Sequence, residues 1–131
     1  MAALKPEIKT FEDLEVWKSC REIRKKVFAI TSRFPAEEKH RLVDQLRRAA
    51  VSATANVAEG YGRYHYQENI QFCRQARGSL YEILDHLTTC LDPSFISEAE
   101  FEELKQDILT GIKLVNGYLR MLQRSKVEHA R

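Results

Sequence analysis

Apolar residues recur every three or four positions along most of the chain. The first such series lies before Pro35 and consists of Val16, Cys20, Ile23, Val27, Ile30 and Phe34. This spacing keeps apolar side chains on one face of an α-helix, and proline stops a helix. The pattern therefore predicts a helix over about residues 12–33, with Thr10 as its N-terminal cap.

Three further apolar series predict helices over about residues 36–60, 66–91 and 98–125. Gly60 and Gly62 are placed to end the second helix, with Gly60 as a left-handed C-terminal residue. Ser97 with Glu100 forms a capping box before the fourth. The links are short, which makes successive helices antiparallel. The predicted fold is all-α: an up-down-up-down four-helix bundle over residues 11–126, with a flexible tail at 1–10 and a frayed end at 127–131.

Composition is typical of one soluble globular domain. The chain has 131 residues, of which 44% are hydrophobic and 31% charged. Its three cysteines, Cys20, Cys73 and Cys90, lack CxxC spacing and fall on apolar stripes, so they are predicted to be reduced core residues. No signal peptide or membrane span is visible, which predicts a cytoplasmic protein with no membrane partner.

Charge is unevenly distributed although the net charge is only +2. Residues 18–48 hold ten Lys or Arg against four acids, and residues 82–107 hold eight acids against one Lys. Such a chain can attract copies of itself as well as phosphates. Solvated helix faces explain the same pattern.

The residues do not predict a catalytic site, a metal site or a cofactor. Di-iron bundles need paired Glu-x-x-His motifs, whereas Glu82 lies four residues before His86 and the motif is not repeated. Gly60 to Arg63 resembles a phosphate-binding loop only faintly, because no strand precedes it and no Lys-Ser or Lys-Thr pair follows.

A row of polar residues follows the alanine-rich face of the second predicted helix. This polar seam comprises Gln45, Arg48, Ser52, Asn56 and Glu59, and Arg77, Ser79 and Glu82 of the third helix are candidate partners. Buried polar groups must be paired, so an internal network that fixes helix register is the favoured interpretation. A subunit contact or ligand groove is the alternative.

Arginine and tyrosine are interleaved around the turn between the second and third predicted helices. The candidate contacts are Arg47, Arg48, Arg63, Arg74, Arg77, Tyr61, Tyr64 and Tyr66. Arginine binds phosphate and tyrosine stacks on bases, so these residues suit RNA or DNA. Both types are also enriched in protein–protein interfaces.

Several sequence blocks together resemble a known family. They are Phe11 to Trp17, Phe34-Pro35 with Glu38, Gln45 to Ser52, Asn56 to Gly60 and Ala76 to Glu82. Over about residues 11–124 the chain resembles the four-helix-bundle proteins encoded in intervening sequences of bacterial 23S ribosomal RNA genes. In this chain Tyr64, His65 and Tyr66 stand where many members carry a Ser-containing cap.

The resemblance implies an assembly as well as a fold. It implies a homopentameric ring without enzymatic activity, similar to the accessory variability determinant of diversity-generating retroelements, which binds nucleic acid and a reverse transcriptase. The motif positions that carry over are Arg47, Arg48, Asn56, Glu59, Arg63, Arg77, Ser79 and Glu82. A ring needs two different patches on each subunit, which the basic and acidic segments offer.

Three functions follow from these observations. The leading hypothesis is a non-catalytic oligomeric adaptor that binds RNA or DNA through basic residues. The alternative is a protein-only scaffold whose partner recognises the bundle surface. An enzyme is the second alternative, and it requires a deep polar pocket with a perturbed titratable group.

Overall fold

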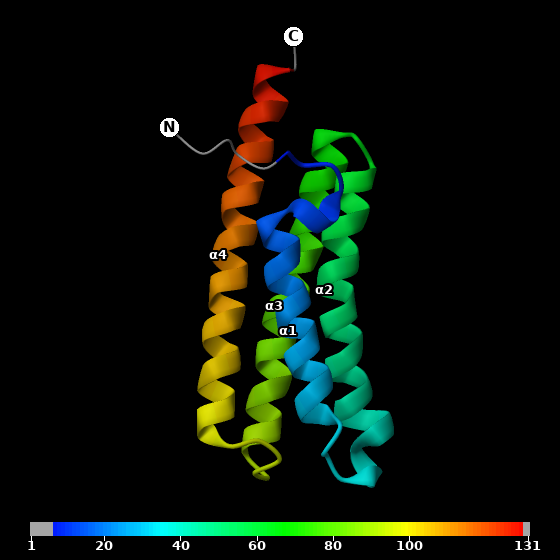
Figure 1. The fold of residues 1–131 in the computed structure, drawn as a ribbon, viewed down its shortest axis with the longest axis vertical. Helices are drawn as coiled ribbons and strands as arrows, with labels where there is room; N and C mark the ends of the chain where they lie inside the picture. Colours follow the sequence, from blue (N-terminus) through cyan, green and yellow to red (C-terminus); the bar gives the residue numbers. More distant parts are fainter. Residues whose placement is uncertain (1–6, 130–131) are drawn as a thin grey trace.

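Four long helices lie side by side in the computed structural model, which describes residues 7–129 (Figure 1). They are α1 (Glu15–Thr31), α2 (Asp44–Gly62), α3 (Tyr66–Leu91) and α4 (Glu98–Glu128). Each helix runs antiparallel to the next, and α4 closes the bundle by packing against α1 as well as α3. The predicted all-α class and the packing of four helices are therefore confirmed.

A single hydrophobic core runs between the four helices. Its fully buried members include Leu46, Val57, Leu80, Ile83, Leu87, Ile108 and Val115. The three cysteines also lie in this core and are free, as predicted. Burial raises the pKa of the Cys20 and Cys73 thiols to about 12, so both thiols stay protonated at neutral pH.

The chain between α1 and α2 is not the continuous helix that the sequence predicts from residue 36. A 3₁₀ turn, η2 (Ala36–Glu38), is followed by one π-helical turn, η3 (Lys39–Val43), and regular α-helix begins only at Asp44. The reason is that the buried apolar series of this helix starts at Val43, so no buried apolar side chain fixes the residues before it. The first helix likewise starts late, because the 3₁₀ turn η1 (Phe11–Asp13) lies between the Thr10 cap and α1.

Of the two glycines predicted to end α2, Gly62 is its last residue, but Gly60 does not take the predicted left-handed conformation. The helix continues to Gly62, and Tyr64, with φ of 59°, takes the left-handed conformation instead. Gly60 is buried against α3, where an added Cβ would lie 2.6 Å from Asn69 Oδ1 and 3.0 Å from Phe72 Cβ. This glycine therefore serves the close approach of two helices.

The start of α4 has the capping box that the sequence predicts, since Ser97 and Glu100 exchange hydrogen bonds. The fourth helix was predicted to end at about residue 125, with a frayed end from residue 127. In the structure α4 continues to Glu128. Residues 130–131 of that predicted end, and 1–6 of the predicted N-terminal tail, lie outside the described residues. No helix of residues 7–129 is long and apolar enough to cross a membrane.

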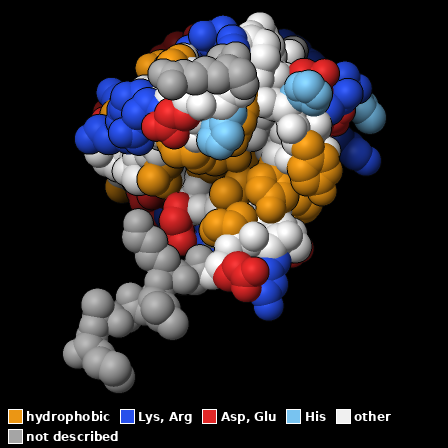
Figure 2. Space-filling view, turned by 90° about the horizontal axis from the view of Figure 1, so that it is seen from above, with side chains coloured by type: hydrophobic (Ala, Val, Ile, Leu, Met, Phe, Trp, Pro, Cys, Tyr) orange, Lys and Arg blue, Asp and Glu red, His pale blue; other side chains and the backbone are white. Residues whose placement is uncertain are grey.

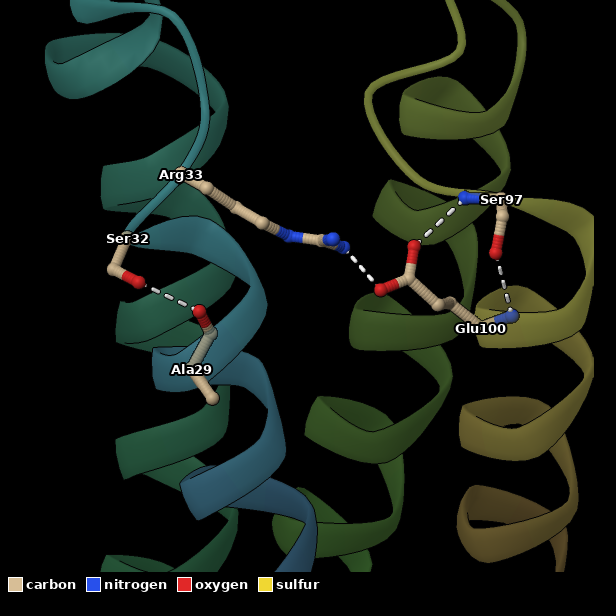
Figure 3. A network of polar contacts seen from close by, with 5 residues as sticks. All are labelled: Ala29, Ser32, Arg33, Ser97 and Glu100. Carbon is tan, nitrogen blue, oxygen red and sulfur yellow. Dashed lines mark hydrogen bonds and ion pairs between the residues drawn. The ribbon is translucent and has the colours of Figure 1, made fainter.

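Ion pairs join α1 to α4 along one side of the bundle. Arg33 reaches from the end of α1 to Glu100, which also accepts the Ser97 backbone N–H (Figure 3). Lys26 Nζ lies 2.6 Å from Asp107 Oδ2 and 3.3 Å from Glu103 Oε1. The basic segment 18–48 and the acidic segment 82–107 were expected to attract different copies of the chain. These ion pairs show that the two segments partly neutralise each other within one chain.

Candidate nucleic-acid interface

Arginines from α3 and α4 line one groove on the outer surface of the bundle. The arginine groove is lined by Arg74, Arg77, Asn116, Leu119, Arg120 and Gln123. Because α3 and α4 are antiparallel, the first half of α3 lies beside the second half of α4. This arrangement brings together arginines that are more than forty positions apart in the sequence.

One arginine of the groove is held in place, and two are free to move. Arg77 Nη1 donates to Asn116 Oδ1 at 2.8 Å, which fixes its guanidinium across the α3–α4 contact. Arg74 and Arg120 are exposed, and neither forms an ion pair with any residue in the described part of the chain. The groove therefore presents three positive charges, and no acidic side chain of the described residues lies within 4.0 Å of them as an ion-pair partner.

Two arginines of α4 were not among the residues predicted from the sequence. Arg120 lines the groove, and Arg124 lies exposed one helical turn further along α4, near Glu128 but without an ion pair to a described residue. Their spacing of four places them on one face of a helix. That signal was present in the sequence, but only the packing of α4 on α3 connects these residues to Arg74.

The predicted arginines and tyrosines do not form one cluster. Arg47 and Arg48 lie near the start of α2, and Arg63 directly follows its end. At 1.5 Å per residue, the 16 positions from Arg47 to Arg63 correspond to about 24 Å along the helix axis. The structure therefore brings Arg74 and Arg77 together with α4 and leaves the other predicted arginines elsewhere.

Arg47 stabilises the contact between α1 and α2. Its Nε donates to Thr31 Oγ1 at 2.9 Å, and its guanidinium lies over the Phe28 ring at 4.8 Å from the centroid. Such contacts hold the guanidinium in place. Arg47 is therefore half-buried and engaged within the chain.

Arg48 and Arg63 each pair with an acid one helical turn before them. Arg48 Nε lies 3.3 Å from Asp44 Oδ2, and Arg63 Nη2 lies 2.8 Å from Glu59 Oε1. Exposed pairs of this kind contribute little to stability. They do reduce the positive charge that these two arginines offer to a phosphate.

The tyrosines lie at the end of the bundle formed by the α2–α3 turn. Tyr64 is 90% exposed, Tyr66 packs against His129, and Tyr61 is half-buried. Seen from above, hydrophobic side chains occupy the middle of this end, and Lys and Arg side chains lie around its edge (Figure 2). Tyr64 is the one predicted tyrosine whose ring is largely open to a stacking partner.

The centre of the polar seam is a hydrogen-bonded network between α2 and α3. Ser52 Oγ and Ser79 Oγ are 2.9 Å apart, and Asn56 Nδ2 donates to Ser52 Oγ at 3.0 Å and to Ser52 O at 2.9 Å. All three side chains are half-buried. These contacts lie within one chain and connect neighbouring helices, as expected for a network that fixes register.

The outer members of the polar seam take different partners. Glu59 pairs with Arg63, and Glu82 lies 3.4 Å from His86 on its own helix. Arg77 bonds to α4 rather than to α2. Gln45 is exposed and lines a separate pocket near the start of α2. The seam predicted as one row is therefore one internal network with unrelated residues at its ends.

Groups suited to metal binding or nucleophilic chemistry are sparse. Across the described residues, no three His, Cys, Asp or Glu side chains lie together in a way that could hold a metal ion. Burial raises the pKa of Cys90 to about 11, with a smaller contribution from the charge of Glu38. Protonated, buried thiols are poor nucleophiles.

Fold and surface together define a helical-bundle protein with an arginine-lined groove between α3 and α4. Residues 12–117 match the family described as 23S rRNA-intervening sequence protein. The match covers most of the chain and includes all of α1, α2 and α3 and more than half of α4. The chain therefore belongs to this family. No curated protein matches it.

Proposed function

We propose that this protein is a non-catalytic oligomeric adaptor that binds RNA or DNA through the arginine groove. The observation that supports the proposal most directly is the convergence of Arg74, Arg77 and Arg120, none of which has an acidic partner within 4.0 Å among residues 7–129. Guanidinium groups bind phosphate oxygens with two parallel hydrogen bonds. Arg124, one turn beyond the groove, adds a further positive charge along the same helix.

The groove suits a phosphate backbone better than a particular base sequence. Arg77 is positioned by Asn116, whereas Arg74 and Arg120 can adjust to phosphates at different spacings. Binding is then dominated by charge and by the release of counterions. Weak sequence preference and a steep dependence on salt concentration follow from this.

Oligomerisation is the second part of the proposal. Leu114 and Met121 are exposed, and their spacing of seven residues places them on one face of α4. A second copy of the chain that packs on this face would bury both side chains. A homopentameric ring, the assembly that the family resemblance implies, would carry several arginine grooves and bind one nucleic acid at several points.

The experiment compares matched charge variants in gel-shift titrations with single- and double-stranded RNA and DNA. Arg74→Gln/Arg120→Gln removes two charges from the groove, and Lys18→Gln/Lys25→Gln removes two exposed charges from α1. We expect the groove variant to reduce the slope of log K against log salt by about 1.4 to 1.8, since each phosphate contact contributes roughly 0.7 to 0.9. The control should keep a slope close to that of the unmodified protein.

Equal effects of the two double variants would contradict a role for the groove. If no nucleic acid shifts at low salt, the protein-only scaffold becomes the better interpretation. In the same preparation, sedimentation velocity should detect an oligomer at micromolar concentration. A monomer under those conditions would remove the oligomeric part of the proposal.

A further inference from the structure

Tyr64 has a backbone conformation that few bulky residues adopt. Its φ of 59° lies in the left-handed region, where the β-carbon of an L-residue is crowded by the neighbouring backbone. Glycine takes this conformation without that strain and is the usual residue at the end of a helix. Tyr64, which follows the end of α2 by two residues, therefore makes the α2–α3 turn less stable than a glycine would.

The Tyr64 side chain makes no visible contribution to the fold. It is 90% exposed, and no hydrogen bond, ring contact or core contact joins it to another described residue. The neighbouring tyrosines differ, because the Tyr66 ring centroid lies 5.6 Å from that of His129 and Tyr61 is half-buried. Strained residues cluster at binding and active sites, where the surrounding structure holds them in place. Both observations indicate that the Tyr64 ring serves a partner outside the chain.

The Tyr64 ring lies at the end of the bundle to which the arginine groove leads. Lys126 of α4 donates a hydrogen bond to Gln67 in the first turn of α3, so α4 and the start of α3 are joined beside the α2–α3 turn (Figure 1). Arg74 lies eight positions after Tyr66 on α3, which corresponds to about 12 Å along the helix axis. A stacked nucleic-acid strand rises about 3.4 Å per nucleotide, so roughly four nucleotides span this distance.

Charge beside the turn is nearly balanced, unlike that of the arginine groove. Arg63 pairs with Glu59 at 2.8 Å, and the exposed Lys126 and Glu68 carry opposite charges. The turn therefore attracts phosphate less strongly than the groove does. What it offers instead is the flat apolar face of an aromatic ring, which is the surface on which nucleobases stack.

Only an unpaired base has a free face for this ring. Inside a duplex each base is covered on both sides by its neighbours, and an enzyme that reaches one must first extrude it. In single strands, loops and ends the bases are free to turn outward and to stack on exposed aromatic side chains. An exposed ring in a turn at the end of a bundle therefore suits a single strand and not a double helix.

We propose that Tyr64 stacks on an unpaired base and that this protein binds single-stranded nucleic acid in preference to duplex. The inference rests on the proposed function, because the phosphates of the same strand occupy the arginine groove. Stacking on the ring is tolerant of sequence, since every base has a π-face. The left-handed backbone at Tyr64 fixes where the ring is presented, and it lowers the stability of the free protein.

The test measures, by fluorescence anisotropy at low salt, the affinity of the full chain for a labelled single strand and for the duplex made from it. Tyr64→Leu removes the ring but keeps a large side chain at the strained position, and Tyr64→Phe keeps the ring. We expect Tyr64→Leu to weaken single-strand binding by about 5- to 100-fold, the usual loss for one base–aromatic stack. Tyr64→Phe should restore most of that affinity, and duplex binding should be the same in all three proteins.

A further variant separates stacking from folding. Tyr64→Gly removes both the ring and the strain, so it should weaken single-strand binding as Tyr64→Leu does and yet raise the urea midpoint of unfolding. A structural role for the ring would lower both quantities together. Val127→Ala is the matched control, because Val127 is a 72% exposed apolar residue near the same end of the bundle and has no aromatic ring.

Unchanged single-strand affinity in Tyr64→Leu would overturn the inference, as would an equal loss of duplex affinity or an equal effect of Val127→Ala. If Tyr64→Leu instead lowers the association state in sedimentation velocity and leaves nucleic-acid binding intact, the ring belongs to a protein contact and the inference is overturned too. The arginine groove is judged separately. Loss of single-strand binding in Tyr64→Leu but not in Arg74→Gln/Arg120→Gln would contradict the groove and keep the ring, and the reverse result would keep the groove and remove the ring. Absence of any binding at low salt would contradict both.

Discussion

At the scale of single residues, Glu100 serves two structures at once. Its carboxylate accepts the Ser97 backbone N–H at 2.9 Å and also pairs with Arg33 of α1. The hydrogen bond from the Ser97 backbone, with a further contribution from Arg33, lowers the pKa of Glu100 below its ordinary value of 4.5. The Glu100 side chain thus caps the N-terminus of α4 and also connects α4 to the end of α1 through Arg33 (Figure 3).

Glu100→Gln keeps an oxygen that can accept the Ser97 N–H but removes the negative charge beside Arg33 and the N-terminus of α4, so it should lower the free energy of unfolding by about 0.3–1 kcal/mol at pH 7. Because the folded pKa lies below the unfolded one, the stabilisation is present above pH 4.5 and is lost as pH falls through the lowered value. Urea unfolding at pH 7 and at pH 3 checks this: the difference between the two proteins should shrink at pH 3. Glu102→Gln, an exposed neighbour on α4, is the control. A difference that persists unchanged at low pH would contradict this account.

At the scale of helices, two glycines inside long helices have different environments. An added Cβ at Gly60 would lie 2.6 Å from Asn69 Oδ1, whereas nothing lies within 4 Å of one at Gly78. Gly60 thus allows α2 and α3 to approach closely. Gly78 does not serve a close helix contact among the described residues. As a glycine in the interior of a helix, it lowers the stability of α3.

The two glycines give a matched pair of substitutions. Gly60→Ala should lower the free energy of unfolding by about 1–3 kcal/mol, because the extra methyl group forces α2 and α3 apart. Gly78→Ala should raise it by roughly 0.5–1 kcal/mol, through better helix propensity. Chemical denaturation of both variants measures the changes. An unchanged or higher stability of Gly60→Ala would show that packing at Gly60 does not limit the helix contact.

At the scale of the whole molecule, the four helices share one core. The buried cluster extends from Val16 and Trp17 at the start of α1 to Leu122 in the last third of α4. No helix has a core of its own, so none should unfold separately. Small domains with one core commonly unfold in a single cooperative transition.

The single tryptophan makes that cooperativity measurable. Trp17 is buried and stacks edge-on against Phe11, so its fluorescence reports tertiary packing at one end of the bundle. Circular dichroism reports all four helices together. We expect the two probes to give the same urea midpoint. A fluorescence change that clearly precedes the loss of helix would show that α1 detaches before the rest unfolds.

The sequence predicted best the features that depend on local chemistry. The three–four spacing of residues such as Leu80 and Ile83 specifies a buried face whatever the neighbours are, and both residues are fully buried. The capping box at Ser97 is equally local, because the cap and its partner are three residues apart. Four packed helices and buried thiols followed from such signals.

What required tertiary structure was every relation between distant residues. Gly60 lies inside α2 and faces Asn69 of α3, a contact that the local turn signal did not contain. The predicted arginine cluster separates because α2 carries its members to opposite ends, while packing of α4 on α3 places Arg120 beside Arg74. Periodicity specifies which face of a helix is buried, but only the assembled bundle decides which exposed charges meet.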